Sequence, residues 1–537
     1  MEKLMLLGDE AIAQAGIDAG MSGIYAYPGT PSTEITEYVI HSREAKAKGI
    51  RAGWSANEKT AMEAALGMSY AGKRAMVCMK HVGLNVAADA FVNAAITGAN
   101  GGLIVVAADD PSMHSSQNEQ DSRFFGKFAM MPIMEPSSQQ EAYDMVHEAF
   151  DLSEKFRIPV LMRITTRLAH SRAGVQPRAK REQNPVQIPS DPRQFILLPA
   201  NARRNYKKLL ANQVSFESDA GASAFNQYID GEDTSRGIIA CGLAYNYLME
   251  NFPSRVVGHP VLKIGQYPVP PALIHRIYEQ CDSLLVLEDG YPIMEELIRG
   301  YLNLGKPIHG RLDGSIPRDG ELDPNNVGAA LGIHHQEGRP VPSLVVPRPP
   351  SLCKGCPHIY SYQSLNDALN TYSKGRVFSD IGCYTLGALQ PFDAINTCVD
   401  MGASITMAKG AADAGFRPAV AVIGDSTFTH SGITGLIDAV NDRSPITVLI
   451  LDNGTTAMTG GQDSMATGRI EAICEGCGVE KDHIHVINPI QKYHEENMAI
   501  MKREIEYEGV SVIIPRRECL VTVASRIRSQ KTENTEA

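Results

Sequence analysis

Asp425 and Asn453 are the two residues whose types and spacing point most directly to chemistry. Each follows an apolar run, residues 422–424 before the aspartate and residues 449–452 before the asparagine. A carboxylate oxygen and an amide oxygen are the kind of ligands that Mg²⁺ takes from proteins, usually sharing the ion with a diphosphate. The backbone carbonyl of Thr455 is the natural third oxygen, so the pattern predicts a magnesium–diphosphate site.

Two strands and a helix must bring these oxygens together. Apolar, β-branched runs that stop at turn-forming residues are typical of buried parallel strands, and residues 431–442 between them form a predicted helix. A strand–helix–strand unit places both ligands at the carboxyl edge of the sheet, where open α/β sheets bind ligands. For these two residues alone, an ordinary strand pair with polar ends is the alternative.

A second segment is suited to the phosphate oxygens. Gly402, Ala403 and Ser404 open a predicted helix, whose N-terminal N–H groups and serine hydroxyl can bind an anion. We expect the cofactor contacts to come from the metal ligands together with a small set of glycines and serines: Gly382, Gly402, Ser404, Gly424 and Ser426.

Glu58 is a candidate acid–base residue near the start of the chain. It follows Asn57 and begins a helical run in which Gly67 lies nine residues later. A carboxylic acid in a dry pocket has a raised pKa and can exchange protons near neutral pH. An acid favoured by the helix dipole is the alternative, and Glu63 is a competing candidate in the same helix.

Four cysteines could hold a metal centre. Cys353 and Cys356 form a chelating pair, and Cys383 and Cys519 follow predicted strands of the same sheet. Four thiolates can close one iron–sulfur cluster. From spacing alone, zinc bound by the first pair with His358 remains open, as do core positions for the other two thiols.

The composition describes an ordinary globular chain. Its 537 residues are 43% hydrophobic and 21% charged, with a formal net charge of −11 and no basic stripe, which argues against a nucleic-acid partner. No run is long enough to cross a membrane, and the N-terminus lacks a signal peptide, so we expect a cytoplasmic protein without disulfides. Cys474 and Cys477 have no companion pair and stay unassigned.

The length predicts about three domains, all of the α/β class. Apolar runs at residues 22–27, 74–79, 102–107 and 158–163 predict strands of a first, doubly wound domain. The predicted segments are a first domain at 1–175, a linker with some helix at 176–235, a smaller α/β domain at 236–337, a proline-rich connector at 338–350, a third domain at 351–528 and a disordered tail at 529–537.

Several stretches, in family order along the whole chain, resemble the 2-oxoacid:ferredoxin oxidoreductases, and specifically the large-subunit family of the indolepyruvate type. They are residues 27–32 (Tyr-Pro-Gly-Thr-Pro-Ser), Asn57 with Glu58, residues 109–112 continuing to Arg123, residues 353–358, 380–387, 424–426 and 459–462, and the arginine-rich segment before Cys519.

The resemblance implies a fold and a set of cofactors. It implies two doubly wound thiamine-binding domains, one for the pyrimidine and one for the diphosphate, separated by a smaller domain like the transketolase C-terminal domain. It also implies thiamine diphosphate activated by Glu58, and Mg²⁺ bound by Asp425, Asn453 and Thr455. One 4Fe-4S cluster would be bound by Cys353, Cys356, Cys383 and Cys519, and the substrate carboxylate by Thr30 and Arg123.

The same resemblance implies a reaction and partners. The expected reaction is oxidative decarboxylation of an aryl 2-oxoacid, with coenzyme A taking the acyl group and electrons leaving through the cluster. Relatives usually carry a ferredoxin-like extension with two Cys-x-x-Cys-x-x-Cys-x-x-x-Cys-Pro runs, and no such run follows Cys519 here. We therefore expect a hetero-oligomer with a smaller beta subunit and with ferredoxin or another electron-carrying chain.

Two other functions are compatible with parts of the pattern. A non-oxidative thiamine enzyme, such as an indolepyruvate decarboxylase or an acetolactate-synthase-like enzyme, needs no cluster. A scaffold subunit that binds a partner and no cofactor needs neither the acid nor the metal ligands. The four cysteines speak against the first, and the joint presence of Glu58, Asp425 and Asn453 speaks against the second.

Overall fold

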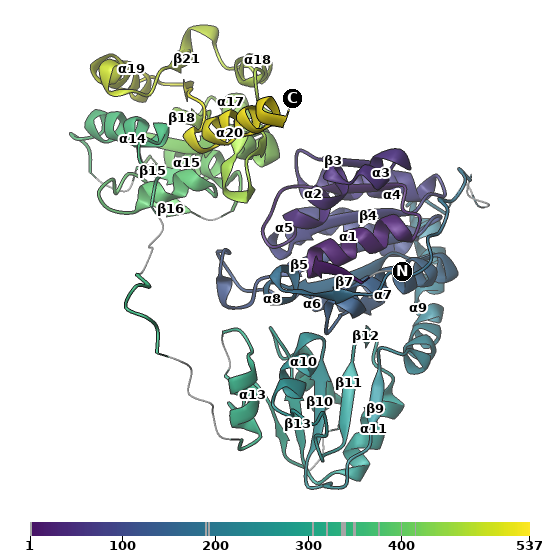
Figure 1. Cartoon of the computed structure of the whole chain (residues 1–537). Helices are drawn as coiled ribbons and strands as arrows, with labels where there is room; N and C mark the ends of the chain where they lie inside the picture. Colours follow the sequence, from purple (N-terminus) through teal and green to yellow (C-terminus); the bar gives the residue numbers. More distant parts are fainter. Residues whose placement is uncertain are drawn as a thin grey trace. The chain divides into compact units, whose positions relative to one another are not determined.

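The chain divides into two compact units, residues 1–339 and residues 340–537. The computed structural model describes residues 3–187, 191, 194–302, 306–317, 320–333, 340–346, 351–373, 376–398, 400–413 and 415–536. The boundary between the units falls in the predicted proline-rich connector at 338–350, of which residues 338, 339 and 347–350 lie outside the described residues. Figure 1 shows the elements of both units.

A seven-stranded sheet forms the centre of the first unit. Its strands, in spatial order, are β12 (Gln266–Tyr267), β6 (Ile133–Met134), β7 (Val160–Thr165), β5 (Leu103–Asp109), β4 (Ala75–Lys80), β2 (Gly23–Ala26) and β3 (Arg51–Trp54). All neighbouring pairs are parallel except β12 with β6. A separate antiparallel pair joins β1 (Leu4–Leu7) to β8 (Arg172–Val175).

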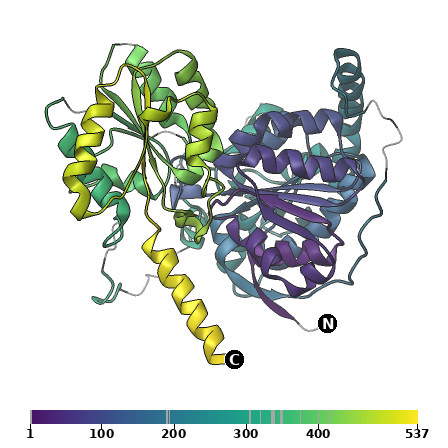
Figure 2. The ribbon, with the colours of Figure 1, turned by 90° about the horizontal axis from the view of Figure 1, so that it is seen from above.

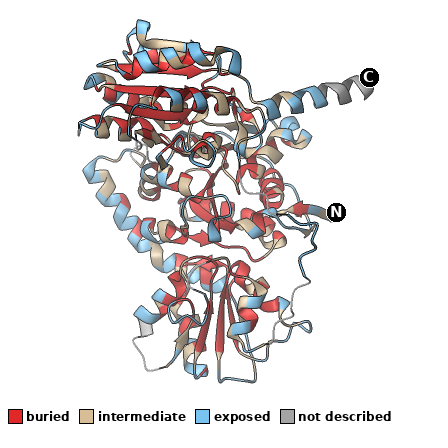
Figure 3. Cartoon of the chain, turned by 90° about the vertical axis from the view of Figure 1, so that its left-hand side faces the viewer, coloured by how far each residue is buried: buried red, intermediate tan, exposed pale blue. Residues whose placement is uncertain are grey.

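Helices connect these strands and supply the apolar covering of the sheet. They are α1 (Gly8–Asp18), α2 (Thr33–His41), α3 (Arg43–Ala47), α4 (Glu58–Tyr70), α5 (His81–Thr97), α6 (Arg123–Ala129), α7 (Gln139–Phe156) and α8 (Thr166–His170). Alternate residues of each strand face opposite helical layers: on β4, Met76 and Cys78 pack in one core and Val77 and Met79 in the other. Figure 3 shows the strands in red, as buried elements between partly exposed helices.

The second sheet of the first unit has five strands. Their order is β14 (Ile308–His309), β13 (Leu284–Leu287), β10 (Gly237–Cys241), β11 (Val261–Ile264) and β9 (Gln227–Ile229), with α10 (Leu243–Glu250), α11 (Pro271–Gln280), α12 (Ile293–Leu302) and α13 (Pro324–Ala330) around them. The predicted linker contains the long helix α9 (Pro199–Ala222) as well as β9, so the second sheet starts before residue 236. The second unit contains a six-stranded, fully parallel sheet and a separate antiparallel pair, β19 (Thr455–Thr456) with β20 (Gln462–Asp463).

The strand order in the second unit is β16 (Thr397–Cys398), β15 (Val377–Ser379), β17 (Ala419–Gly424), β18 (Ile446–Leu451), β22 (Val510–Pro515) and β21 (Ile484–Ile487). Its helices are α14 (Pro357–Ala368), α15 (Ala403–Asp413), α16 (Asp425–Thr427), α17 (Ile433–Asn441), α18 (Ile470–Gly476), α19 (His494–Ile505) and α20 (Leu520–Glu536). Figure 2 shows helices on both faces of this sheet, with α20 (yellow) extending away from it.

Helix α20 runs to Glu536, and residues 520–536 contain neither glycine nor proline to end it. The disordered tail at 529–537 stays a prediction. Among the residues that the structure describes, no helix is both long enough and apolar enough to cross a membrane.

Candidate active site

The predicted site residues fall into two groups that lie in different units. In the second unit, the parallel pairing of β17 with β18 places Gly424 opposite Leu451, so the two chains leave the sheet side by side. The backbone N–H of Gly454 donates to Oδ2 of Asp425 over 3.0 Å, and the N–H of Thr455 donates to Oδ1 of Asn453 over 3.0 Å. The structure thus brings Asp425, Asn453 and Thr455 together, all three buried.

The electrostatics of Asp425 suit a cation ligand. Burial, and after it the nearby negative charge of Asp452, raise the pKa of this carboxyl to about 7 against the opposing effect of hydrogen bonds from Ser426, Ser464 and Gly454. A carboxylate held in such a place is costly to ionise unless a positive charge balances it. A divalent ion at this strand end would supply that charge.

The predicted phosphate-binding segment has the backbone and the free polar atom that an anion needs. Gly402 has a φ of +97°, and a Cβ there would lie 2.6 Å from the Cβ of Ser431, so only glycine fits. Ser404 follows in the first turn of α15, and its buried Oγ has no hydrogen-bond partner. An unsatisfied buried hydroxyl at a helix N-terminus fits a phosphate oxygen.

Other side chains pack around the same carboxyl ends of the sheet strands. The hydroxyl of Thr456 donates to Oγ of Ser426 over 3.0 Å. A Cβ on Gly382 would lie 2.2 Å from the ring of Tyr384, and one on Gly424 would lie 2.5 Å from that ring. The ring therefore packs directly on the backbone of two of the glycines predicted to contact the cofactor.

The structure brings the four predicted cluster cysteines into one electrostatic neighbourhood. Burial, and after it the charges of Cys356, Cys519, Asp425 and Cys353, raise the pKa of the Cys383 thiol to about 12. The thiol of Cys356, whose pKa burial raises to about 11, is likewise affected by Cys353 and Cys519. All ten cysteines of the chain are free thiols.

Local backbone contacts position these thiols beside the metal ligands. The N–H of Cys356 donates to the carbonyl of Cys353 over 2.9 Å, in the turn that leads into α14. The N–H of Cys519 donates to the carbonyl of Asn453 over 3.1 Å, and the amide of Asn453 lies 4.0 Å from the Sγ of Cys383. Cys519 and Cys383 thus lie beside Asn453, at the carboxyl end of β18.

His358 is a residue of this site that sequence reasoning gave no role in the favoured prediction. Its Nε2 lies 3.5 Å from the Sγ of Cys383 and 3.4 Å from the amide nitrogen of Asn453. Burial lowers the pKa of this imidazole to about 4, which keeps the ring neutral at physiological pH. A neutral imidazole can bind metal, so the zinc alternative is compatible with these contacts.

Glu58 occupies the first turn of α4 in the first unit. Asn57 caps the helix by accepting a hydrogen bond from the N–H of Thr60 over 2.9 Å. The Glu58 carboxylate is buried against α5, where a Cβ added to Gly83 would lie 2.5 Å from its Oε1. The competing Glu63 is exposed and pairs with Lys59, so burial favours Glu58.

Thr30 lies in a short loop between β2 and α2. The Ser32 hydroxyl donates to the carbonyl of Gly29 over 2.8 Å, and the Gly29 N–H donates to Oγ1 of Thr33 over 3.0 Å. Lys80, a residue without a predicted role, packs beside this loop: a Cβ on Gly29 would lie 3.3 Å from its Cβ. Burial lowers the pKa of Lys80 to about 8. The sequence feature that could have identified Lys80 is its position as a charged residue at the end of a buried, apolar strand.

Arg123 lies fully buried between the two sheets of the first unit. Its guanidinium pairs with Asp121 at 2.6 Å and Glu288 at 3.0 Å, and donates to the Tyr267 hydroxyl at 3.3 Å. These contacts link the first domain to the second, and they occupy the guanidinium. The substrate-binding role of Arg123 stays a prediction.

Comparisons with known proteins match both groups of site residues. A family described as pyruvate flavodoxin/ferredoxin oxidoreductase, thiamine diphosphate-binding, matches residues 14–222. A second family, the C-terminal thiamine pyrophosphate-binding domain of thiamine pyrophosphate enzymes, matches residues 380–514. The first range contains Thr30 and Glu58, and the second contains Asp425 and Asn453.

Full-length relatives decide the family. Indolepyruvate oxidoreductase subunit IorA of Archaeoglobus fulgidus is 40% identical over 97% of this chain and 87% of its own length. The protein of the same name from Pyrococcus horikoshii is 37% identical over 98% of this chain and 87% of its own. The chain belongs to the family of indolepyruvate oxidoreductase subunit IorA. Thiamine diphosphate-binding domains are present in both matched ranges.

A solved structure overlaps the chain in part. A 2-oxoglutarate:ferredoxin oxidoreductase from Magnetococcus marinus matches 57% of this chain and 62% of its own at 17% identity, with a TM-score of 0.48.

Proposed function

We propose that the chain is the catalytic subunit of a thiamine diphosphate-dependent 2-oxoacid:ferredoxin oxidoreductase that acts on aryl pyruvates of the indolepyruvate type. Membership of the IorA family supports the reaction class. One observation supports the use of a cluster in this reaction. The Cys383 thiol lies 4.0 Å from the amide of the predicted metal ligand Asn453, and the charges of three other cysteines act on it. Thiols beside a diphosphate site suit an oxidative enzyme, because they can hold an electron acceptor there.

The residues present fit the three inorganic and organic groups that this function needs. Asp425, Asn453 and the Thr455 carbonyl would hold Mg²⁺ and, through it, the diphosphate. The unsatisfied hydroxyl of Ser404 and the backbone at Gly402 would bind its phosphate oxygens. Cys353, Cys356, Cys383 and Cys519 would hold one 4Fe-4S cluster. When bound, thiamine diphosphate supplies the electron sink for decarboxylation and the cluster accepts the electrons.

The chain's own groups handle protons and charge. Glu58, buried against Gly83, would hold the proton that the aminopyrimidine ring of the cofactor shares with a carboxyl group. The Thr30 hydroxyl, in the loop after β2, would donate to the carboxylate of the substrate. Lys80 lies beside that loop with a lowered pKa, and its cation would attract the same carboxylate.

The proposed reaction requires an electron carrier, a partner subunit and an acyl acceptor. Electrons must leave through ferredoxin or another electron-carrying chain, and relatives of the family are named as subunits, which supports a smaller partner subunit in a hetero-oligomer. Coenzyme A would accept the acyl group.

Dye-linked kinetics test the proposal. The full chain is produced anaerobically with its partner subunit, and coenzyme A-dependent reduction of a viologen dye is measured with indolepyruvate, pyruvate and 2-oxoglutarate. We expect the highest kcat/KM for the aryl substrate, and no dye reduction without coenzyme A. Carbon dioxide release with aldehyde formation and no dye reduction would instead identify a non-oxidative decarboxylase.

A further inference from the structure

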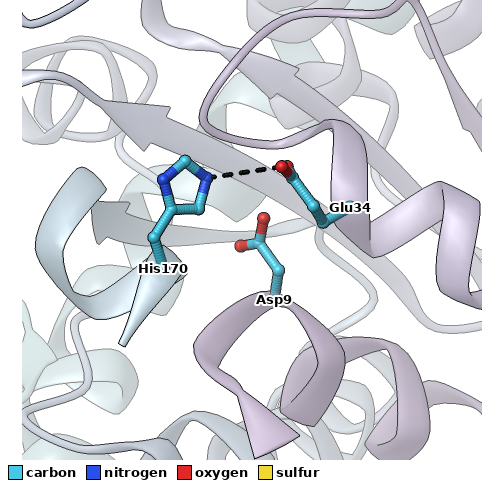
Figure 4. Close-up of side chains that lie close together, drawn as sticks. All are labelled: Asp9, Glu34 and His170. Carbon is cyan, nitrogen blue, oxygen red and sulfur yellow. Dashed lines mark ion pairs between the residues drawn. The ribbon is translucent and has the colours of Figure 1, made fainter. Parts of the chain in front are cut away.

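Three side chains outside the proposed active site converge near the start of the first unit. They are Asp9 in the first turn of α1, Glu34 in the first turn of α2 and His170 at the end of α8. Figure 4 shows the three side chains pointing toward one another from these separate helices. One ligand atom from each lies within 4.8 Å of those from the other two.

Asp9 is the unusual member of this group. It is 0% exposed, and neither of its carboxylate oxygens has a hydrogen-bond partner. The Oε2 atom of Glu34 is also buried and unpartnered. Buried carboxylates normally accept hydrogen bonds, and leaving two oxygens without a donor costs several kcal/mol unless a cation approaches them.

Stabilisation by the helix dipole does not account for Asp9. Its neighbour Glu10 behaves as a helix-start acid should, because its Oε2 accepts the N–H of Leu7 over 2.8 Å. Asp9 points the other way, toward Glu34 and His170. Burial and the charge of Glu34 raise the pKa of the Asp9 carboxyl well above its usual value, so in the metal-free chain the two acids share a proton. A cation bound between them would replace that proton.

The separation between the other two groups fits a shared ion better than a direct bond. Nε2 of His170 lies 3.6 Å from Oε1 of Glu34, which is long for a hydrogen bond. Two ligands of a tetrahedral ion with bonds of roughly 2.0–2.1 Å are about 3.4 Å apart. Glu34 and His170 are partly exposed, with 37% and 36% of their side chains accessible, so an ion has an entry path from solvent.

We propose that Asp9, Glu34 and His170 bind a divalent transition-metal cation. Two carboxylates and one imidazole balance the charge of such an ion, and mixed oxygen and nitrogen ligands suit Mn²⁺, Fe²⁺ or Zn²⁺. The ion joins α1 and α8 to the first turn of α2, which directly follows the loop that contains Thr30. It serves as a structural cross-link behind that loop.

Manganese titration tests this site separately from the thiols, because thiolates favour softer ions. The full chain is freed of metal with a chelator, and bound Mn²⁺ is measured from the loss of the free-ion electron paramagnetic resonance signal. We expect Asp9→Asn and His170→Ala each to lose one Mn²⁺ equivalent, with affinity at that site lowered at least about tenfold. The exposed position of His170 makes misfolding of that variant a minor concern.

Two controls separate the alternatives. His114→Ala removes an exposed histidine that pairs with Glu321 at 3.2 Å but has no buried acid beside it, and it should keep the full Mn²⁺ equivalent. Asp425→Ala should lose only the equivalent that belongs to the other predicted ion site, and a further loss should follow when Asp9→Asn is added to it. Equal Mn²⁺ uptake by the wild type, Asp9→Asn and His170→Ala would overturn the proposal.

Thermal unfolding gives a second readout. Mn²⁺ should raise the Tm of the wild type and of His114→Ala, because a ligand that binds the folded chain stabilises it. The rise should be smaller in His170→Ala, because only the predicted ion site at Asp425 remains. A rise of the same size in His170→Ala would also count against the site.

Discussion

The Glu58 carboxylate lies against the backbone of Gly83, so that a Cβ at Gly83 would fall 2.5 Å from Oε1, 2.6 Å from Cγ and 2.8 Å from Cδ of the glutamate. Real Cβ contacts do not come this close. Helix α5 therefore forms the wall that keeps the Glu58 side chain in its buried position, and the absence of a side chain at Gly83 makes room for it.

Gly83→Ala should lower turnover about tenfold to a hundredfold without unfolding the first unit. The added methyl group displaces the Glu58 carboxylate by about an ångström, and misplacement on this scale is costly in catalysis. Steady-state kinetics with the aryl 2-oxoacid measure the effect. Gly67→Ala is the matched control, since Gly67 lies in α4, the helix that contains Glu58, and a Cβ there meets nothing within 4 Å.

Glu58→Gln should lower kcat by about two to four orders of magnitude, the range for loss of a positioned acid or base. Because glutamine has nearly the same shape, the circular dichroism spectrum and the Tm should change little. Glu63→Gln removes an exposed acid that pairs with Lys59 and should leave kcat unchanged. If Glu63→Gln gives the large loss and Glu58→Gln does not, the assignment of Glu58 is wrong.

Retention of thiamine diphosphate should weaken as the pH falls below about 7. The pKa of Asp425 is raised to about 7 in the folded chain without metal, so below that pH a proton increasingly occupies the oxygens that Mg²⁺ needs. We expect the apparent Mg²⁺ affinity, measured by isothermal titration calorimetry, to fall up to about tenfold per pH unit below 7 and to level off above it. Asp425→Ala should abolish cofactor retention at every pH.

The same raised pKa affects the stability of the metal-free chain in the opposite direction. Because the folded carboxyl binds its proton more tightly than the unfolded one, the stability contribution is full below about pH 4 and is lost as the pH rises to about 7. Asp425→Asn should flatten this pH dependence of Tm. Asp482→Asn, which removes an exposed acid in the same unit, should not change it.

Cys383→Ser should abolish the cluster. Anaerobically prepared wild type is expected to contain close to four irons and four sulfides per chain, with the visible absorption of a 4Fe-4S centre. Cys477→Ser changes a half-buried cysteine that is not among the predicted ligands and should keep the full iron content. Zinc in place of iron in the anaerobic protein would support the alternative in which Cys353, Cys356 and His358 hold that ion.

Arg123→Met should destabilise the first unit by about 3–5 kcal/mol, because it leaves the buried carboxylate of Glu288 without its cation and Asp121 with only Arg163, at 3.6 Å. Chemical denaturation monitored by circular dichroism measures this change. Arg276→Met, which removes an exposed arginine paired with Asp230, should change stability by less than about 1 kcal/mol. A neutral effect of Arg123→Met would mean that the network is not required for folding.

The parallel strands were the most predictable part of the fold. The strands predicted at residues 22–27, 74–79, 102–107 and 158–163 correspond to β2, β4, β5 and β7, because a fully buried parallel strand needs a continuous apolar run. The strand–helix–strand unit around Asp425 was also correct: β17 and β18 flank α17, which a π-helical turn precedes.

Short or polar elements escaped prediction for a physical reason. β6, β12 and β9 have two or three residues each, too few for a periodic pattern. These segments become strands because neighbouring strands pair with them. Within the site, the positions of Asp425, Asn453 and Cys383 after predicted strands were enough to predict that these three residues lie in one site. The contacts of His358 and Gly83 depend on how helices pack, which one sequence does not reveal.

Strand β12 has a consequence for dissecting this protein. It comes from the segment that follows β11 of the five-stranded sheet, yet it completes the edge of the seven-stranded one through Gln266 and Tyr267. A shortened chain that stopped at the end of the predicted linker would bare the edge of β6, and it would deprive Arg123 of Glu288. Such a fragment should be prone to aggregation through its open edge, so expression trials should keep residues 1–339 in one piece.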